Sequence, residues 1–407
     1  MGEVVITGLG PIASNGVGKK CFWEAISSGK TGIRRITGFD SSGIPCRIAG
    51  EIQPEWITAA NGFYPPGLPD SKSCRFSVLA TMLALEDAGL TPSDLAGYRT
   101  AVYFGVSTTD MEVVQREYIA YKNNGSARSD SLISAFPHTP AVIVAQALKS
   151  YKKVITISTA CTSGLNSIIF GAEAIRRDEA DLVIAGGVDT PLSALVLSGF
   201  CSAKMVPTGF NDRPGEASRP FDDERQGGIL SEGAGVVILE SRVNALRRKA
   251  KIYASISGSG LSTDMSVTRM KTTIFEAMSR ALDEARLRPE EIDYICACAP
   301  GDSIIDRVET GAIKDLFGEQ ASAVAISSIK SMIGNPGAGG GPLQAITAAL
   351  AIEHSFIPPT VNLNKPGKSC DLDYVPIRGR VARVNRVLIN VRGFGGGMSS
   401  LVLSKSA

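Results

Sequence analysis

The stretch Val154-Ile155-Thr156-Ile157-Ser158-Thr159-Ala160-Cys161 shows the local pattern from which the fold can be inferred. Four residues that favour β structure precede a turn of small residues, and a helix is expected from about Thr162 to Arg177. This step places the Cys161 thiol at a helix N-terminus, where free amides favour a thiolate and can hold an oxyanion. A small buried cysteine at a tight strand–helix turn has the same pattern, so a structural role stays open.

The same order of apolar strand, Gly/Ser turn and helix recurs through the first half of the chain. Strands are expected at Val4–Thr7, Thr100–Phe104 and Asp181–Ala185, each followed by a turn such as Gly8-Leu9-Gly10. Continuous apolar runs of this kind indicate strands that helices cover on both faces. The pattern therefore predicts an α/β fold with a largely buried sheet.

The order restarts near residue 250, where Lys251–Ile256 is followed by Gly258-Ser259-Gly260. A helix is then expected at Ile274–Ala285, and the last strand at Ser400–Leu403. Two repeats are thus predicted, with boundaries at residues 1–242 and 250–407. No linker rich in Pro, Gly or Ser separates them, so they are expected to share one core.

Composition excludes several classes of function. The 407 residues are 44% hydrophobic, and 42 basic against 40 acidic residues give a net charge of 42 − 40 = +2, which argues against nucleic-acid binding. The eight scattered cysteines are typical of reduced thiols in a cytoplasmic protein. Cys296 and Cys298 lack a second pair at zinc spacing, so no metal is expected. No apolar run is long enough to span a membrane, and no targeting signal is apparent.

A nucleophilic cysteine usually works with a histidine base, and this chain has two histidines, His138 and His354. His138 lies in a proline-bounded loop, and His354 closes an expected helix before Pro358-Pro359. Neither follows a strand-to-turn step like that of Cys161. Both are therefore interpreted as surface or capping residues.

Beyond these local patterns, the sequence resembles the elongating β-ketoacyl-ACP synthases (ketosynthases) of fatty acid and polyketide synthesis. The resemblance covers nearly the whole chain, and its ordered set of motifs is specific although each motif alone is weak. The motifs are Val4-Val5-Ile6-Thr7-Gly8-Leu9-Gly10, Phe22-Trp23-Glu24-Ala25, Thr159-Ala160-Cys161-Thr162-Ser163, Ala185-Gly186-Gly187, Ser218-Arg219-Pro220-Phe221-Asp222, Glu232-Gly233-Ala234-Gly235, Pro359-Thr360-Val361-Asn362 and Cys370-Asp371-Leu372-Asp373-Tyr374-Val375-Pro376.

The resemblance implies a duplicated thiolase fold with five layers, α-β-α-β-α, and a tight dimer. It also implies that Cys161 is the nucleophile, that an acyl carrier protein is the partner, and that no cofactor is needed. The mostly apolar segment Ala141–Leu148, just before the nucleophile strand, is the expected dimer contact.

The chain departs from the family where two catalytic histidines are implied. Cys298, in Cys296-Ala297-Cys298-Ala299-Pro300, fills the position of the first histidine, and Asn335 follows Lys330-Ser331-Met332-Ile333-Gly334 in place of the second. The supporting Glu309 and Lys330 are retained. An asparagine amide can still donate a hydrogen bond to an enolate oxygen, whereas a thiol is a weak donor.

A third departure lies in Asn390-Val391-Arg392-Gly393-Phe394, where the resemblance implies an acyl-pocket gate and an oxyanion region. Arg392 replaces the aromatic gate. A guanidinium at the mouth of an acyl tunnel is costly to bury unless it is paired, so a fatty chain would avoid it. Alternatively, Arg392 turns outward and pairs with an acid.

Two main interpretations follow. In the first, the chain is a non-condensing subunit that resembles a chain-length factor and pairs with an active ketosynthase; the missing histidines and Arg392 favour it. In the second, it is an active acyltransferase or condensing enzyme, as a homodimer, in which Cys298 and Asn335 stand in for the histidines; the intact Cys161 favours this. A self-acylating carrier or a decayed copy is the remaining alternative.

Overall fold

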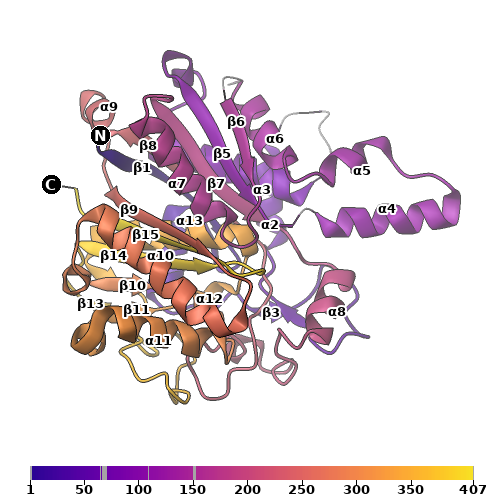
Figure 1. Cartoon of the computed structure of the whole chain (residues 1–407). Helices are drawn as coiled ribbons and strands as arrows, with labels where there is room; N and C mark the ends of the chain where they lie inside the picture. Colours follow the sequence, from indigo (N-terminus) through magenta and orange to yellow (C-terminus); the bar gives the residue numbers. More distant parts are fainter. Residues whose placement is uncertain (1, 65, 67–70, 109, 150–152, 407) are drawn as a thin grey trace.

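The computed structural model describes residues 2–64, 66, 71–108, 110–149 and 153–406 (Figure 1). Its largest element is a sheet whose strands follow the order β11-β10-β14-β15-β9-β1-β8-β7-β5-β6, with β2 paired to β1. The strands are β1 Val4–Ala13, β2 Gly16–Val17, β3 Arg34–Arg35, β4 Ile48–Ala49, β5 Thr100–Val106, β6 Lys153–Ile157, β7 Leu182–Asp189, β8 Gly233–Ser241, β9 Ala254–Thr263, β10 Tyr294–Cys296, β11 Ala325–Ser327, β12 Phe356–Ile357, β13 Arg380–Val381, β14 Arg386–Arg392 and β15 Gly397–Ser404.

The two halves of this sheet have the same topology. In the first half β5 runs parallel to β6 and β7, and β8 lies antiparallel between β7 and β1. In the second half β10 runs parallel to β11 and β14, and β15 lies antiparallel between β14 and β9. The halves join where β1 pairs with β9 through Val5 and Ile6. The predicted duplication of the fold is confirmed.

Helices cover both faces of each half. The helices are α1 Lys19–Ser27, α2 Pro54–Asn61, α3 Lys72–Asp87, α4 Met111–Asn124, α5 Ser129–Ser134, α6 Thr139–Ala147, α7 Ser163–Arg176, α8 Ala194–Ser202, α9 Arg242–Arg247, α10 Met270–Ala285, α11 Ile305–Phe317, α12 Lys330–Ile333 and α13 Gly340–His354. The central pair, α7 and α13, packs between the half-sheets, while α3 and α6 lie outside one and α10 and α11 outside the other. These are the predicted five layers.

One part of the sequence prediction is wrong. Gly8 and Gly10, interpreted as turn residues, lie inside strand β1, and Gly258 and Gly260 lie inside β9. Their role is close packing, because a Cβ at Gly8 would come within 2.2 Å of a backbone oxygen of α3 and one at Gly260 within 2.0 Å of a backbone oxygen of α10. Glycine here allows a helix to approach the strand, which a turn-based interpretation of glycine overlooks.

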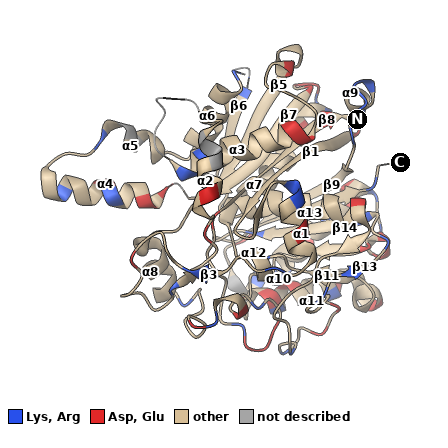
Figure 2. Ribbon diagram, turned by 180° about the vertical axis from the view of Figure 1, so that it is seen from behind, with Lys and Arg blue, Asp and Glu red and all other residues tan. Residues whose placement is uncertain are grey.

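Helices α4 and α5 form an arm that projects from the body (Figure 1). Figure 2 shows both basic and acidic residues along α4. The arm also exposes large apolar side chains, at Val114, Tyr118, Ile119, Tyr121 and Ile133. None of the helices in the described part of the chain combines the length and apolar character needed to cross a bilayer.

Candidate active site

Cys161 lies on the turn between β6 and α7, as the sequence predicts. Ala160, immediately before it, has a φ of 56°, a left-handed conformation that is unusual for a residue with a side chain. The turn is held by hydrogen bonds: the Thr159 N–H donates to Ser163 Oγ at 2.8 Å, and Thr162 Oγ1 donates to the Thr159 carbonyl. A strained turn of this kind, fixed by hydrogen bonds within residues 159–163, presents the thiol to the site.

The charge state of Cys161 is set by opposing influences. Burial raises the pKa of the thiol, and the carboxylate of Asp189 raises it further. The ammonium of Lys330 and hydrogen bonds from the N–H groups of Phe394 and Cys161 lower it, but burial outweighs them. The expected thiolate is therefore not the resting form. These two N–H groups, of Phe394 and Cys161, lie where the oxyanion donors are expected, and that role stays a prediction.

Cys298 lies just after β10 in a closely hydrogen-bonded setting. The N–H groups of Cys298 and Ala299 donate to the two oxygens of Glu309 at 2.9 and 2.8 Å. Lys330 Nζ donates to the Cys298 carbonyl at 2.6 Å and lies 3.6 Å from its Sγ. The Arg392 N–H also donates to this Sγ, at 3.3 Å. Glu309 and Lys330 therefore fix the backbone and side chain of Cys298.

Asn335 follows the short helix α12 and reaches the same site. Its N–H donates to the Ile229 carbonyl at 2.7 Å, which fixes the backbone. Its Oδ1 is buried and accepts no hydrogen bond from any residue the structure describes. A side-chain amide whose polar atoms are not used by the protein can serve a ligand.

The gate region lies at the end of β14. A Cβ at Gly393 would lie 3.1 Å from the Thr159 carbonyl oxygen and 3.4 Å from the Cys161 nitrogen, so a small residue is needed beside the nucleophile turn. Phe394 is 72% exposed as a whole residue, although its N–H hydrogen-bonds Cys161. Arg392 is half-buried, and its side chain forms no ion pair with any described residue. The alternative in which it pairs outward with an acid is therefore wrong for the described part of the chain.

These side chains surround one open cavity, whose empty space is about 880 Å³ when the solvent at its mouth is included. Its described lining residues are Ser107, Thr108, Cys161, Asp189, Pro191, Phe200, Met205, Gly228, Ile229, Leu230, Cys298, Pro300, Asp302, Ile305, Lys330, Asn335, Gly337, Arg392 and Phe394. The cavity brings together Cys161, Cys298, Lys330, Asn335 and Arg392, all named from the sequence. Glu309 stands behind Cys298 and does not line it.

Asp189, at the end of β7, is a residue of the site that was not predicted from the sequence. Its carboxylate accepts hydrogen bonds from the N–H groups of Ser107 at 3.0 Å and Thr108 at 2.8 Å, and burial raises its pKa to about 6. The available signal was its position: it ends an apolar strand, β7, that runs parallel to β5, and β5 in turn runs parallel to β6, so the three strands end at the same edge of the sheet. No comparable sequence pattern marks the apolar residues that line the cavity, such as Met205 and Ile229.

The two histidines lie outside this cavity. His138 is exposed and stacks on Phe136 with ring centroids 5.5 Å apart, while His354 stacks on Trp23 at 4.7 Å. The interpretation of both as surface residues is confirmed by their positions. All eight cysteines are free, and the described residues contain no cluster of three or more His, Cys, Asp or Glu side chains suited to a metal ion.

Comparison with known proteins places this site in a family. The β-ketoacyl synthase N-terminal domain matches residues 1–245, and the β-ketoacyl synthase C-terminal domain matches residues 253–364. The chain belongs to the β-ketoacyl synthase family. It is 39% identical over 416 residues to the granaticin polyketide putative β-ketoacyl synthase 1 of Streptomyces violaceoruber, an alignment that covers 99% of this chain and 98% of the relative.

Solved structures of the β-ketoacyl synthase family share the whole fold. The ishigamide ketosynthase/chain length factor superposes with a TM-score of 0.90 at 32% identity, and all of both chains is covered. A type II polyketide acyl-carrier protein in complex with its ketosynthase (AntDE:AntF) also gives a TM-score of 0.90, at 29% identity and with full coverage of both chains. The thiolase fold and the place of this chain among the ketosynthases of polyketide and fatty acid synthesis are thereby confirmed.

Proposed function

We propose that this chain is an acyl-accepting subunit that does not condense acyl groups by itself and that pairs with an active ketosynthase. The observation that carries the proposal is the difference between the two sulfur atoms of one cavity. Cys161 has two N–H groups directed at its Sγ and an open cavity before it. The Sγ of Cys298 instead accepts a hydrogen bond and faces an ammonium.

Acyl transfer to Cys161 needs only a thiol and an oxyanion site. The Sγ attacks a thioester carbonyl, the N–H groups of Phe394 and Cys161 stabilise the oxyanion, and the carrier thiol departs with the proton. We propose an acyl carrier protein as the donor, because the AntDE:AntF structure pairs such a carrier with a ketosynthase of the same fold. We expect the complex to lie in the cytoplasm, where the eight free thiols stay reduced.

Decarboxylative condensation needs donors for an enolate oxygen, and this site is poor in them. A thiol is a weak donor, and the Sγ of Cys298 already accepts the Arg392 N–H. The side-chain amide of Asn335 is then the remaining neutral donor. Loss of one preorganised donor typically costs about 10²- to 10³-fold in rate.

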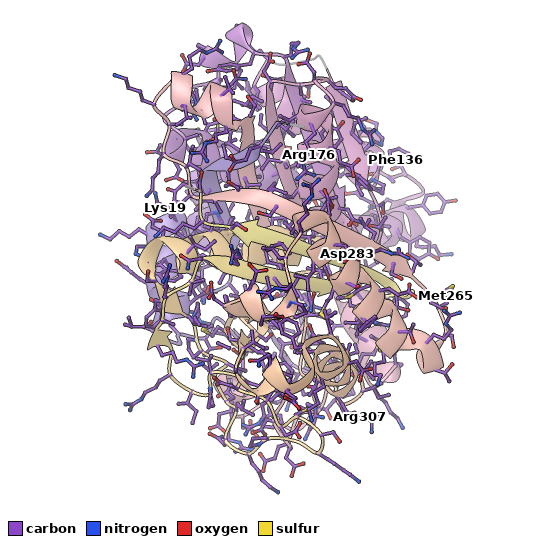
Figure 3. The ribbon with its side chains drawn as sticks, turned by 60° about the vertical axis from the view of Figure 1, so that its left-hand side comes forward. Lys19, Phe136, Arg176, Met265, Asp283 and Arg307 are labelled. Carbon is purple, nitrogen blue, oxygen red and sulfur yellow. The ribbon has the colours of Figure 1, made fainter. Side chains whose placement is uncertain are left out.

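The proposed dimer contact involves the edge strand β6 and the α4–α5 arm. Most of the expected contact segment Ala141–Leu148 packs in the core of its own chain, and Val142 is its exposed apolar residue, at 41%. By contrast, β6 ends the sheet and exposes Ile155, and Phe136 beside the arm lies at the outer margin of the molecule (Figure 3). An open edge strand with apolar side chains is a suitable surface for pairing.

Ile155→Lys is expected to weaken the dimer, which native mass spectrometry and size-exclusion chromatography would detect. Val243→Lys is the matched control, because Val243 is an exposed apolar residue on α9, outside the proposed contact. Equal dimer stability in both variants would refute this contact surface without bearing on the acylation of Cys161.

The pairing itself is tested by co-expression with a histidine-bearing ketosynthase. A heterodimer should form, and replacing the partner's nucleophile with alanine should abolish condensation, whereas Cys161→Ala in this chain should leave it measurable. A homodimer that condenses acyl groups unaided, and loses all activity in Cys161→Ala, would contradict the proposal.

That outcome would support the second candidate, an active condensing enzyme. The observation in its favour is that Lys330 and Asn335 line the cavity together, with Glu309 behind Cys298. The measured quantity that separates the two is the rate of malonyl thioester decarboxylation by the purified homodimer.

A further inference from the structure

Two cationic side chains meet at the cavity without a counter-ion in direct contact. Lys330 is 3% exposed and hydrogen-bonds the carbonyl and Sγ of Cys298. Arg392 is half-buried and lines the cavity beside Cys161. Neither forms an ion pair with an acid in the described part of the chain. Unpaired buried charge is unfavourable, so a bound anion in direct contact with these two cations would stabilise them.

The groups behind the cavity do not neutralise this charge. Burial raises the pKa of the Cys298 thiol although Lys330 and Arg392 act to lower it, so the sulfur does not supply a full negative charge at neutral pH. Glu309 interacts with Lys330 through charge, but its two oxygens accept the N–H groups of Cys298 and Ala299. Glu309 therefore acts on Lys330 without direct contact, and no charge interaction of Glu309 with Arg392 accompanies it.

Two further acids line the cavity, and neither forms an ion pair with Arg392 or Lys330 in the described part of the chain. Asp189 accepts the N–H groups of Ser107 and Thr108, and burial raises its pKa to about 6. Asp302 accepts two N–H groups at the start of α11, at 2.8 and 2.9 Å. The guanidinium of Arg392 thus remains available to an anion that enters the cavity.

We propose that Arg392, supported by the charge of Lys330, binds the carboxylate of a short carboxylated acyl group, of malonyl or succinyl length, while its thioester carbonyl lies at Cys161. This inference rests on the proposed acyl-accepting function and names its substrate class. A planar guanidinium binds a carboxylate through paired N–H donors, and such charge-assisted bonds are strong in a partly buried site.

The covalent step is an ordinary acyl exchange. The Cys161 Sγ forms a bond to the acyl carbonyl, the bond from that carbonyl to the donor sulfur breaks, and the thiol proton passes to the departing thiol. The distal carboxylate is not consumed, and it keeps its contact with Arg392. A neutral chain of the same length would instead place methyl groups against the guanidinium, which is unfavourable.

The test compares succinyl-pantetheine with butyryl-pantetheine, which have the same number of acyl carbons, by intact-mass spectrometry of Cys161. The wild type should acylate about tenfold to a hundredfold faster with succinyl, the range expected for one charge-assisted contact. Arg392→Met should remove this preference, and Arg392→Lys should keep part of it. Malonyl- and acetyl-pantetheine form a second pair that tests the shorter length.

Arg307→Met is the matched control, because Arg307 is exposed on α11 and does not line the cavity (Figure 3). It should keep the succinyl preference. A succinyl rate no faster than butyryl in the wild type, or an unchanged ratio in Arg392→Met, would overturn the inference. An unchanged circular-dichroism spectrum and melting temperature of Arg392→Met, compared with the wild type, would show that the variant is folded.

A second measurement avoids the variant altogether. Free succinate should slow the alkylation of wild-type Cys161 by iodoacetamide, and butyramide at equal concentration should not; equal effects would overturn the inference. If none of the four thioesters labels Cys161, the proposed acyl-accepting function fails. If neutral and carboxylated thioesters label equally, only the role of Arg392 fails.

Discussion

The two halves of the chain present their functional residues in the same way, yet they have diverged in what they present. In the first half, β6 leads through a strained turn to Cys161 at the start of α7. In the second half, β11 leads to Lys330 on α12 and on to Asn335, while Cys298 follows β10. The first half keeps the proposed nucleophile with its expected oxyanion donors, and the second keeps its framework without histidines. We therefore expect acyl transfer and decarboxylation to be separable properties of one cavity.

The largest expected effect is the loss of the nucleophile. Cys161→Ala should abolish acylation by any thioester, because the thiol that forms the new bond is removed. Intact-mass spectrometry gives the result directly, with Cys298→Ala as the matched control for the other thiol in the cavity. Labelling that persists in Cys161→Ala and disappears in Cys298→Ala would reverse the assigned roles of the two halves.

The complementary change places histidines at the two positions of the second half where the family has them. The double variant Cys298→His/Asn335→His should raise malonyl thioester decarboxylation by about 10²-fold or more, since each preorganised donor typically contributes about that factor. Release of labelled CO₂ is the measurement, and each single variant is a control. No increase, in a variant that still acylates Cys161, would show that the framework of the second half no longer supports the reaction.

The two halves also differ in how much of their structure and site could be predicted from the sequence. Apolar strands followed by small residues predicted the duplicated fold and the position of Cys161, because those features depend on local structure and strand burial. Cys298 and Asn335 were found by resemblance alone, since their neighbourhood shows no catalytic pattern. The glycines at 8, 10, 258 and 260 were misinterpreted because a turn and a close strand–helix contact both require glycine.

Other features depend on contacts between distant segments. The hydrogen bonds that hold Asp189 in the cavity come from the loop after β5, more than 80 residues earlier in the chain. The projecting arm could not be distinguished from a packed helix, because exposure depends on what the rest of the fold leaves uncovered. The raised pKa of the Cys161 thiol likewise follows from burial, which the local pattern of a helix N-terminus does not reveal.

A charge from the second half should influence the nucleophile of the first. Lys330 lowers the pKa of Cys161, so Lys330→Met should raise that pKa and slow alkylation at pH 7 by about tenfold, equivalent to roughly one pKa unit. The pH profile of iodoacetamide alkylation measures the shift. An unchanged pH profile would mean that the Lys330 ammonium does not act on Cys161. The role of Lys330 would then be limited to its hydrogen bonds to Cys298.

The smallest expected effect comes from Asp189, within the first half. Its carboxylate raises the pKa of Cys161, and its own pKa is about 6, so the repulsion acts above that pH. Asp189→Asn should therefore lower the pKa of the thiol and speed alkylation by about threefold at pH 8, a shift of about half a pKa unit. Below pH 6 the rates should converge. Slower alkylation at pH 8 would contradict this sign.

The most direct test of the account measures both reactions in one sample of the purified chain. Acyl occupancy of Cys161 and release of CO₂ from malonyl-carrier protein would be followed together, beside a histidine-bearing ketosynthase. We expect Cys161 to become acylated while CO₂ release stays at least about a hundredfold below that of the reference enzyme. Release at the reference rate, or no acylation of Cys161, would contradict it.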